Sequence, residues 1–126
     1  MSRRTAAVLT AALALAGMTS LAGCGSSGGT AQPAPAASSV AYAAIIDVRT
    51  PAEFAQGHVV GARNIDVESA GFAAEIAALP TSGTYLVYCR SGNRSAQAAT
   101  KMRAAGLDVI DGGAMTDMVD AGWPKA

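Results

Sequence analysis

Apolar and polar positions along the chain follow two spacings, one typical of buried strands and the other of helices. Short, nearly continuous apolar runs are typical of parallel strands covered on both faces. They predict strands within residues 40–48 (strongest over 44–48) and over 85–88 and 109–110, and a further short strand is expected over 62–65, after the turn that begins at Gly57. Apolar residues three or four positions apart predict helices over residues 69–79, 95–105 and 114–120. This alternation predicts an α/β domain with a central, mainly parallel sheet flanked by helices on both faces.

Polar residues and glycines mark where several predicted elements begin and end. Thr50-Pro51-Ala52-Glu53 has the sequence of a helix start, with threonine as N-cap, proline at the first helical position and glutamate completing a capping box. Gly57 ends this short helix, and Asp111-Gly112-Gly113 predicts a turn after the last strand. At the end of the first strand, the opposite charges of Asp47 and Arg49 predict an ion pair that braces the loops.

The N-terminal part of the chain has the composition of an export segment followed by a linker. Arg3 and Arg4 precede an apolar stretch, residues 6–17, that is too short to span a bilayer. Residues 24–39 are rich in Gly, Ser, Ala and Pro and lack periodicity, so they predict a disordered tether. We therefore expect a signal peptide over residues 1–23, a tether over 24–39 and one folded domain over 40–126.

The sequence Leu21-Ala-Gly-Cys24 resembles the lipobox of bacterial lipoproteins, in which the cysteine is lipidated on sulfur and becomes the first mature residue. The resemblance implies a lipid anchor on Cys24 that holds the protein to a bacterial membrane, in the cell envelope and facing outside the cytoplasm. An ordinary secretory signal with a chance cysteine near its cleavage site is the alternative.

The charge balance argues against nucleic-acid binding. The chain has nine basic and nine acidic side chains, and removal of residues 1–23 leaves seven and nine, a net charge of −2. The sequence also has no basic stripe interleaved with aromatic residues. We therefore expect no nucleic-acid partner.

Cys89 is the strongest candidate for a reactive group. The apolar run 85–88 delivers it to the start of a polar loop, Cys89-Arg90-Ser91-Gly92-Asn93-Arg94, and Ser95 is predicted to be the N-cap of the next helix. Backbone N–H groups, the positive helix end and two arginines all favour a thiolate at this place. A small core cysteine at a strand end is the alternative. By count alone, Cys24 and Cys89 also allow a disulfide, although each has a separate explanation.

Several motifs follow one another along the domain: Ile46-Asp-Val-Arg49 with Pro51 and Glu53-Phe54, Gly57-His58, Gly61-Ala-Arg-Asn-Ile65, Tyr88-Cys-Arg-Ser-Gly-Asn-Arg-Ser95, Gly112-Gly113 and Ala121-Gly-Trp-Pro124. In this order they make residues 45–124 resemble a rhodanese-like domain, the single-domain sulfurtransferase family. The chain departs from the family in its short start before the first strand and in lacking a tryptophan soon after Gly113. The resemblance implies that Cys89 is the catalytic residue, with substrate bound by Arg90, Ser91, Gly92, Asn93, Arg94 and Ser95.

The resemblance also implies a two-step reaction. Cys89 takes the outer sulfur of a small sulfur-containing anion such as thiosulfate, forming a persulfide, and passes it to a cyanide-like acceptor or to a small or protein thiol. No metal and no organic cofactor are implied. The alternative from a different class is a rhodanese-fold sulfur-relay or binding module with little turnover alone.

The length of the loop bears on a third alternative, a small phosphatase or arsenate reductase. Protein tyrosine phosphatases need one residue more between cysteine and arginine than the four that separate Cys89 from Arg94. Ser95 stands where that arginine would be. The family resemblance implies that the shorter loop suits sulfane sulfur and the longer loop phosphate or arsenate, so this alternative is less favoured.

Overall fold

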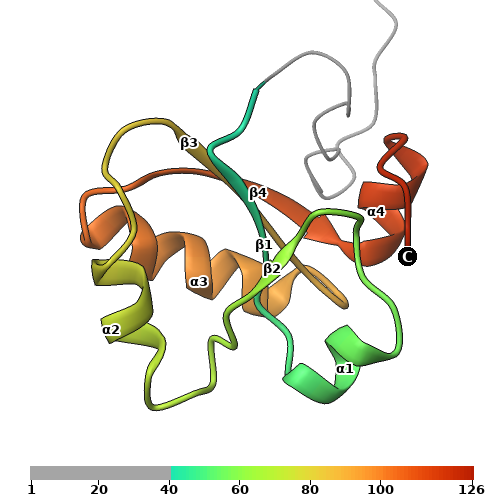
Figure 1. Cartoon of the computed structure of the whole chain (residues 1–126), viewed down its shortest axis with the longest axis horizontal. Helices are drawn as coiled ribbons and strands as arrows, with labels where there is room; N and C mark the ends of the chain where they lie inside the picture. The colour runs from blue at the N-terminus through green and yellow to red at the C-terminus, as the bar shows by residue number, and fades with distance from the viewer. Residues whose placement is uncertain (1–40) are drawn as a thin grey trace, which may run out of the picture.

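A computed structural model describes residues 41–126 and is shown in Figure 1. The predicted signal peptide over residues 1–23, the predicted lipidation site Cys24 and the predicted tether over 24–39 lie outside the described residues. Among residues 41–126, no helix has the length and apolar character needed to cross a bilayer.

Four parallel strands form the sheet of the described region, in the order β2-β1-β3-β4. β1 (Ala44–Asp47) and β3 (Thr84–Cys89) lie at the centre, between β2 (Arg63–Asn64) and β4 (Asp108–Ala114). The chain crosses from β1 to β2 on one side and then returns to β3 on the other. The carboxyl ends of β1 and β3 therefore border a topological switch point, where open α/β sheets bind their ligands.

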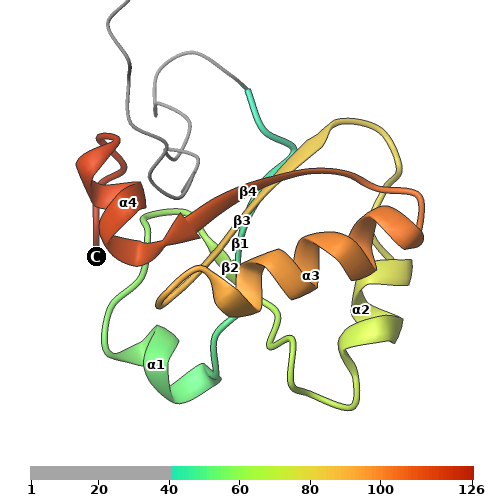
Figure 2. The ribbon, with the colours of Figure 1, turned by 180° about the vertical axis from the view of Figure 1, so that it is seen from behind.

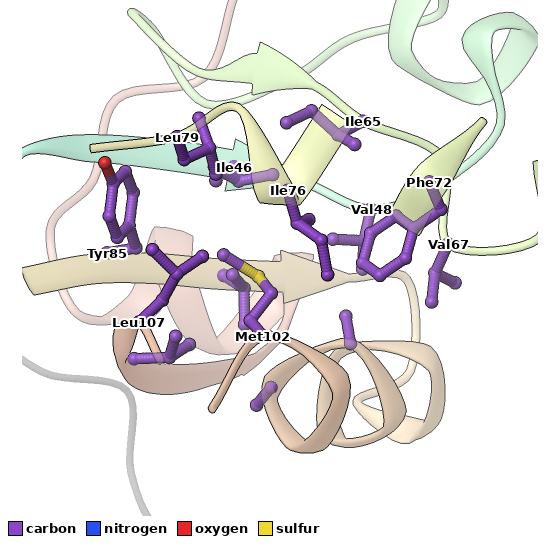
Figure 3. Close-up of a cluster of buried hydrophobic side chains, with 14 of the residues drawn as sticks. Ile46, Val48, Ile65, Val67, Phe72, Ile76, Leu79, Tyr85, Met102 and Leu107 are labelled. Atoms are coloured by element: carbon purple, nitrogen blue, oxygen red, sulfur yellow. The ribbon is translucent and has the colours of Figure 1, made fainter. Parts of the chain in front are cut away.

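Successive side chains of β3 point to opposite faces of the sheet, because side chains alternate along a strand. Tyr85, Val87 and Cys89 join one buried cluster, whereas Leu86 and Tyr88 join the other. The first cluster is covered by α2 (Phe72–Ala77) and α3 (Asn93–Ala104), as Figure 3 shows, and the second by α4 (Met115–Asp120). Figure 2 shows the arrangement from behind. The predicted parallel sheet with helices on both faces is confirmed.

The short helix α1 (Pro51–Ala55) follows β1 as the sequence predicts. The Thr50 hydroxyl oxygen accepts a hydrogen bond from the Glu53 N–H at 3.3 Å, and the Glu53 carboxylate accepts one from the Thr50 N–H at 3.1 Å. The capping box is confirmed, and it fixes the direction in which the chain leaves the carboxyl end of β1. None of the five residues of α1 is buried, so the packing of its apolar side chains contributes little to holding it in place.

The predicted turn at Asp111–Gly113 is wrong, because β4 continues through these residues to Ala114. Val87 pairs with Asp111 but Cys89 pairs with Ala114, so β4 contains one extra residue at this point. This irregularity is a β-bulge, with Gly113 at a φ of 77° that favours glycine. A glycine pair that reads as a turn in the sequence therefore serves to bend a strand beside Cys89.

Other observed boundaries differ from the predicted ones by a few residues. The first strand, Ala44–Asp47, lies within residues 40–48 as predicted and covers all but the last residue of the strongest part, 44–48. The second strand covers Arg63–Asn64 rather than 62–65, and α2 covers Phe72–Ala77 rather than 69–79. The last strand is longer than the predicted 109–110. After α4, the tail returns to the loop between α1 and β2 and pairs antiparallel with it, Val59 opposite Lys125. Figure 1 shows the end of the chain beside this loop.

Candidate active site

Cys89 is the last residue of β3, and its side chain is fully buried. Its Sγ accepts a hydrogen bond from the Gly92 N–H at 2.9 Å. Several backbone N–H groups were predicted around the sulfur, and among the described residues the N–H of Gly92 is the one that donates to it. This hydrogen bond holds the sulfur at the start of α3.

The loop ends earlier than predicted, since α3 begins at Asn93 with Gly92 as its N-cap. The predicted N-cap at Ser95 is wrong. Ser95 lies inside the first turn, fully buried, and its hydroxyl donates to the Gly92 carbonyl at 3.0 Å. A second contact of 3.4 Å reaches the carbonyl of Gly113 in the bulge. Ser95 therefore ties the loop to the strand behind it, and the positive end of α3 lies at the sulfur.

Arg94 is bound to Glu53 of α1. Its guanidinium donates two hydrogen bonds of 2.8 Å to the two carboxylate oxygens of Glu53, and Glu68 lies 3.5 Å away. The Arg94 hydrogen bonds lower the pKa of Glu53 to about 2, although burial opposes this shift. The same contact raises the pKa of Arg94. The charge of Arg94 is thus largely compensated within the protein.

The other predicted loop residues are more open. Arg90, Ser91 and Asn93 are exposed, and Gly92, with a φ of 92°, is half-buried. Asn93 accepts a hydrogen bond of 3.4 Å from Gln97 one turn further along α3. The structure therefore places the six predicted binding residues around Cys89, but with Ser95 buried and Arg94 engaged by Glu53.

A buried polar network holds the base of the loop. The Asp47 carboxylate binds Arg49 through several hydrogen bonds and accepts another, of 2.8 Å, from the Tyr88 hydroxyl. The Tyr88 oxygen in turn accepts a hydrogen bond of 2.9 Å from the Val59 N–H. Burial and this contact with Asp47 raise the pKa of Tyr88. The predicted ion pair between Asp47 and Arg49 is confirmed, and Tyr88, the residue before Cys89, joins this pair to β3.

A pocket of about 210 Å³ opens beside the loop. It is lined by side chains of both charges and by neutral residues, namely Arg49, Glu53, Gln56, Gly57, Arg90, Met115 and Lys125. Arg90 follows Cys89 in the chain, and Met115 follows Ala114, the strand partner of Cys89. The pocket therefore adjoins the immediate neighbours of the thiol. In residues 41–126, no three metal-ligating side chains cluster together.

Three residues of this region were not identified as part of the site from the sequence. In the sequence, Glu53 was assigned to the capping box. Its negative charge, opposite to that of Arg94, was the available signal that it also pairs with this arginine. Tyr88 was read as part of an apolar strand, and Lys125 carried no motif. The places of these three residues in the site depend on contacts between parts of the chain that are distant in sequence. Glu53 and Arg94, for example, are 41 positions apart.

Comparison with known proteins gives a consistent result. The family model of the rhodanese-like domain matches residues 32–115. The chain is 35% identical over 81 residues to thiosulfate sulfurtransferase 16 of Arabidopsis thaliana, covering 53% of this chain and 68% of that protein. It is 38% identical over 64 residues to the probable adenylyltransferase/sulfurtransferase MoeZ of Mycobacterium tuberculosis, covering 51% of this chain but 16% of that protein.

Among solved structures, the chain is similar to a rhodanese from E. coli that was solved with anions. The TM-score is 0.56 and the identity 32%, over 66% of this chain and 95% of that one. The sequence match and the fold thus point to one family, and the matched residues include the whole Cys89 loop.

Proposed function

The chain belongs to the rhodanese-like domain family, and on that basis we propose that it is a sulfurtransferase that carries sulfane sulfur as a persulfide on Cys89. One observation supports this most: the thiol ends a central strand at the topological switch point and accepts a hydrogen bond from the Gly92 N–H at the start of α3. Relatives named as thiosulfate sulfurtransferases, and the E. coli rhodanese solved with anions, support an anionic sulfur donor.

The proposed first step uses thiosulfate or a related anion. The Cys89 thiolate attacks the outer sulfur of the donor, so that a new S–S bond forms while the bond from that sulfur to the sulfonate sulfur breaks. The electron pair of the broken bond leaves with sulfite. Cys89 then carries a persulfide, whose negative outer sulfur lies near the positive end of α3.

In the second step, a nucleophilic acceptor such as cyanide attacks the outer sulfur of the persulfide. Thiocyanate leaves, and the Cys89 thiolate is restored with its electron pair. A thiol acceptor takes the sulfur in the same way and becomes a persulfide itself. Neither step needs an external oxidant or reductant, because the sulfane sulfur keeps its oxidation state as it passes from the donor to Cys89 and then to the acceptor.

The test is turnover of the full chain, purified in detergent, with thiosulfate and cyanide. We expect equal amounts of sulfite and thiocyanate, parallel lines in double-reciprocal plots as for a ping-pong reaction, and loss of both products in Cys89→Ser. Cys24→Ala is the matched control and should retain full turnover. Absence of both products would contradict an enzyme acting on this donor, and a persulfide that forms without discharge would favour the relay module.

We also propose that the domain is anchored to a bacterial membrane, outside the cytoplasm, by lipid on Cys24. The support is the signal-like segment that precedes Leu21-Ala-Gly-Cys24 and the linker-like composition after it. In a bacterial host, the wild-type chain and Cys89→Ala should fractionate with membranes, whereas Cys24→Ala should not. Membrane fractionation of Cys24→Ala would contradict the lipid anchor.

A further inference from the structure

The pocket beside the Cys89 loop contains two positive charges without a counter-charge. Of its charged lining residues, Arg49 is paired with Asp47 and Glu53 with Arg94. Within residues 41–126, Arg90 and Lys125 make no ion pair. Both side chains are exposed, so their charges face the space that a soluble ligand enters.

The fold holds Lys125 at this place. The tail pairs with the loop after α1 through three backbone hydrogen bonds: His58 N–H to Ala126 at 3.2 Å, Ala126 N–H to His58 at 2.8 Å, and Val60 N–H to Pro124 at 2.8 Å. A Cβ atom at Gly57 would lie 2.8 Å from Cε of Lys125. Gly57 therefore leaves room for the lysine stem, and the tail is fixed in register rather than free.

Building on the proposed sulfur-transfer function, we propose that Lys125 is a specificity-determining residue that, together with Arg90, selects doubly charged sulfane donors over singly charged ones. Two uncompensated cations match the two negative charges of thiosulfate. A singly charged thiosulfonate offers one charge to the same pair. Lys125 acts on binding of the donor and not on the bond-breaking step, because it lines the pocket and, within residues 41–126, makes no side-chain hydrogen bond or ion pair with Cys89.

The size of the expected effect follows from Coulomb attraction at an exposed site. Removing one positive charge should raise the half-saturating concentration on the order of tenfold for thiosulfate and roughly threefold for a thiosulfonate. The difference should shrink as salt is added, because both partners are open to solvent. The rate at saturating donor, and the discharge of the persulfide by cyanide, should change little.

The experiment measures formation of the Cys89 persulfide by intact mass in the full chain, as a function of methanethiosulfonate or thiosulfate concentration. Lys125→Gln is the test variant, and Lys125→Arg should restore the selectivity for thiosulfate. Lys101→Gln is the matched control, since Lys101 is also exposed but lies on α3 over the ring of Phe72, at 5.6 Å. Equal half-saturation of wild type and Lys125→Gln for both donors would overturn the inference.

A second measurement separates this inference from the proposed function. In Cys89→Ala, which cannot form a persulfide, thiosulfate is titrated while the backbone amide signals of Gly57 and Lys125 are followed by NMR. We expect saturable shifts that weaken in the Lys125→Gln double variant. If the wild-type chain forms no persulfide but these shifts occur, the proposed reaction is contradicted and the proposed anion site is supported. If the persulfide forms but these amide signals do not shift, the proposed anion site is contradicted and the proposed reaction is supported.

Discussion

Arg94 and Glu53 form an ion pair at the candidate active site, joined by two hydrogen bonds of 2.8 Å between guanidinium and carboxylate. The pair links the first turn of α3, which follows the Cys89 loop, to α1, a helix with no buried residue of its own. Arg94 was predicted to attract the anionic donor. From its pairing with Glu53 we infer instead that Arg94 mainly positions the loop and α1.

We predict that Glu53→Gln lowers the free energy of unfolding by about 1–3 kcal/mol, because it replaces a charged, two-pronged contact of partly buried groups. The side chains of Arg94 and Glu53 are 22% and 23% exposed, so solvent screens this pair only in part. Urea denaturation at neutral pH measures the change. Glu75→Gln is the control, since its contact with Arg63 is 3.9 Å long and exposed, and should cost less than about 0.5 kcal/mol. Equal effects of the two variants would contradict the assignment.

The same pair predicts sensitivity to acid. Arg94 lowers the pKa of Glu53 from 4.5 to about 2, so the unfolded chain binds a proton at this group at a higher pH than the folded chain does. The stabilisation is therefore complete above pH 4.5 and is lost as the pH falls toward 2. Wild type should lose stability across this window more steeply than Glu53→Gln. Parallel pH profiles of the two proteins would contradict the low pKa.

Gly112 allows β4 to pass between β3 and α4. A Cβ atom at this position would lie 2.6 Å from Sδ of Met118 and 3.1 Å from the Val87 carbonyl. We predict that Gly112→Ala destabilises the domain by roughly 2 kcal/mol or more, since the backbone oxygen cannot move away. Gly71→Ala is the control, because its φ of −83° suits alanine and its Cβ would meet its nearest neighbour at 3.6 Å. Thermal unfolding of both variants measures the difference, and a neutral Gly112→Ala would contradict the packing.

Tyr88→Phe tests the buried network below the loop. The change removes the hydroxyl that donates to Asp47 and accepts from the Val59 N–H, and so leaves two buried groups short of a partner. We predict a loss of about 2–4 kcal/mol in the free energy of unfolding. Tyr85→Phe is the control, since its hydroxyl makes one hydrogen bond, 2.7 Å, to the Pro80 carbonyl at the far end of the strand. A larger effect at Tyr85 would contradict this account.

The sequence was most informative where structure depends on neighbouring residues. The capping box of Thr50 and Glu53, the parallel sheet and the placement of Cys89 at a strand end follow from local spacing and apolar runs. Ser95 was misassigned because serine is a common N-cap, whereas Gly92 takes that place with a φ of 92° and Ser95 bonds backward to its carbonyl. Gly112-Gly113 was misassigned because pairing with β3 outweighs the local preference of glycine for turns.

The parts of the site that could not be predicted depend on distant contacts. Nothing near Glu53 in the sequence indicates Arg94, 41 positions away, as its partner. Lys125 lines the pocket because the tail pairs with residues 58–60. No apolar pattern in the sequence indicates this contact. The candidate nucleophile was thus identified from its own loop in the sequence. The groups that hold the loop and line the pocket could be identified only once the fold was known.

We propose that Cys89 accepts sulfane sulfur, and both steps of the proposed reaction depend on this. The most direct measurement is the intact mass of the reduced full chain before and after incubation with thiosulfate, with cyanide then added to the product. We predict a gain of one sulfur atom per chain, its loss on addition of cyanide, and no gain in Cys89→Ser. No gain with thiosulfate or any other sulfane donor, or an unchanged gain in Cys89→Ser, would contradict the account.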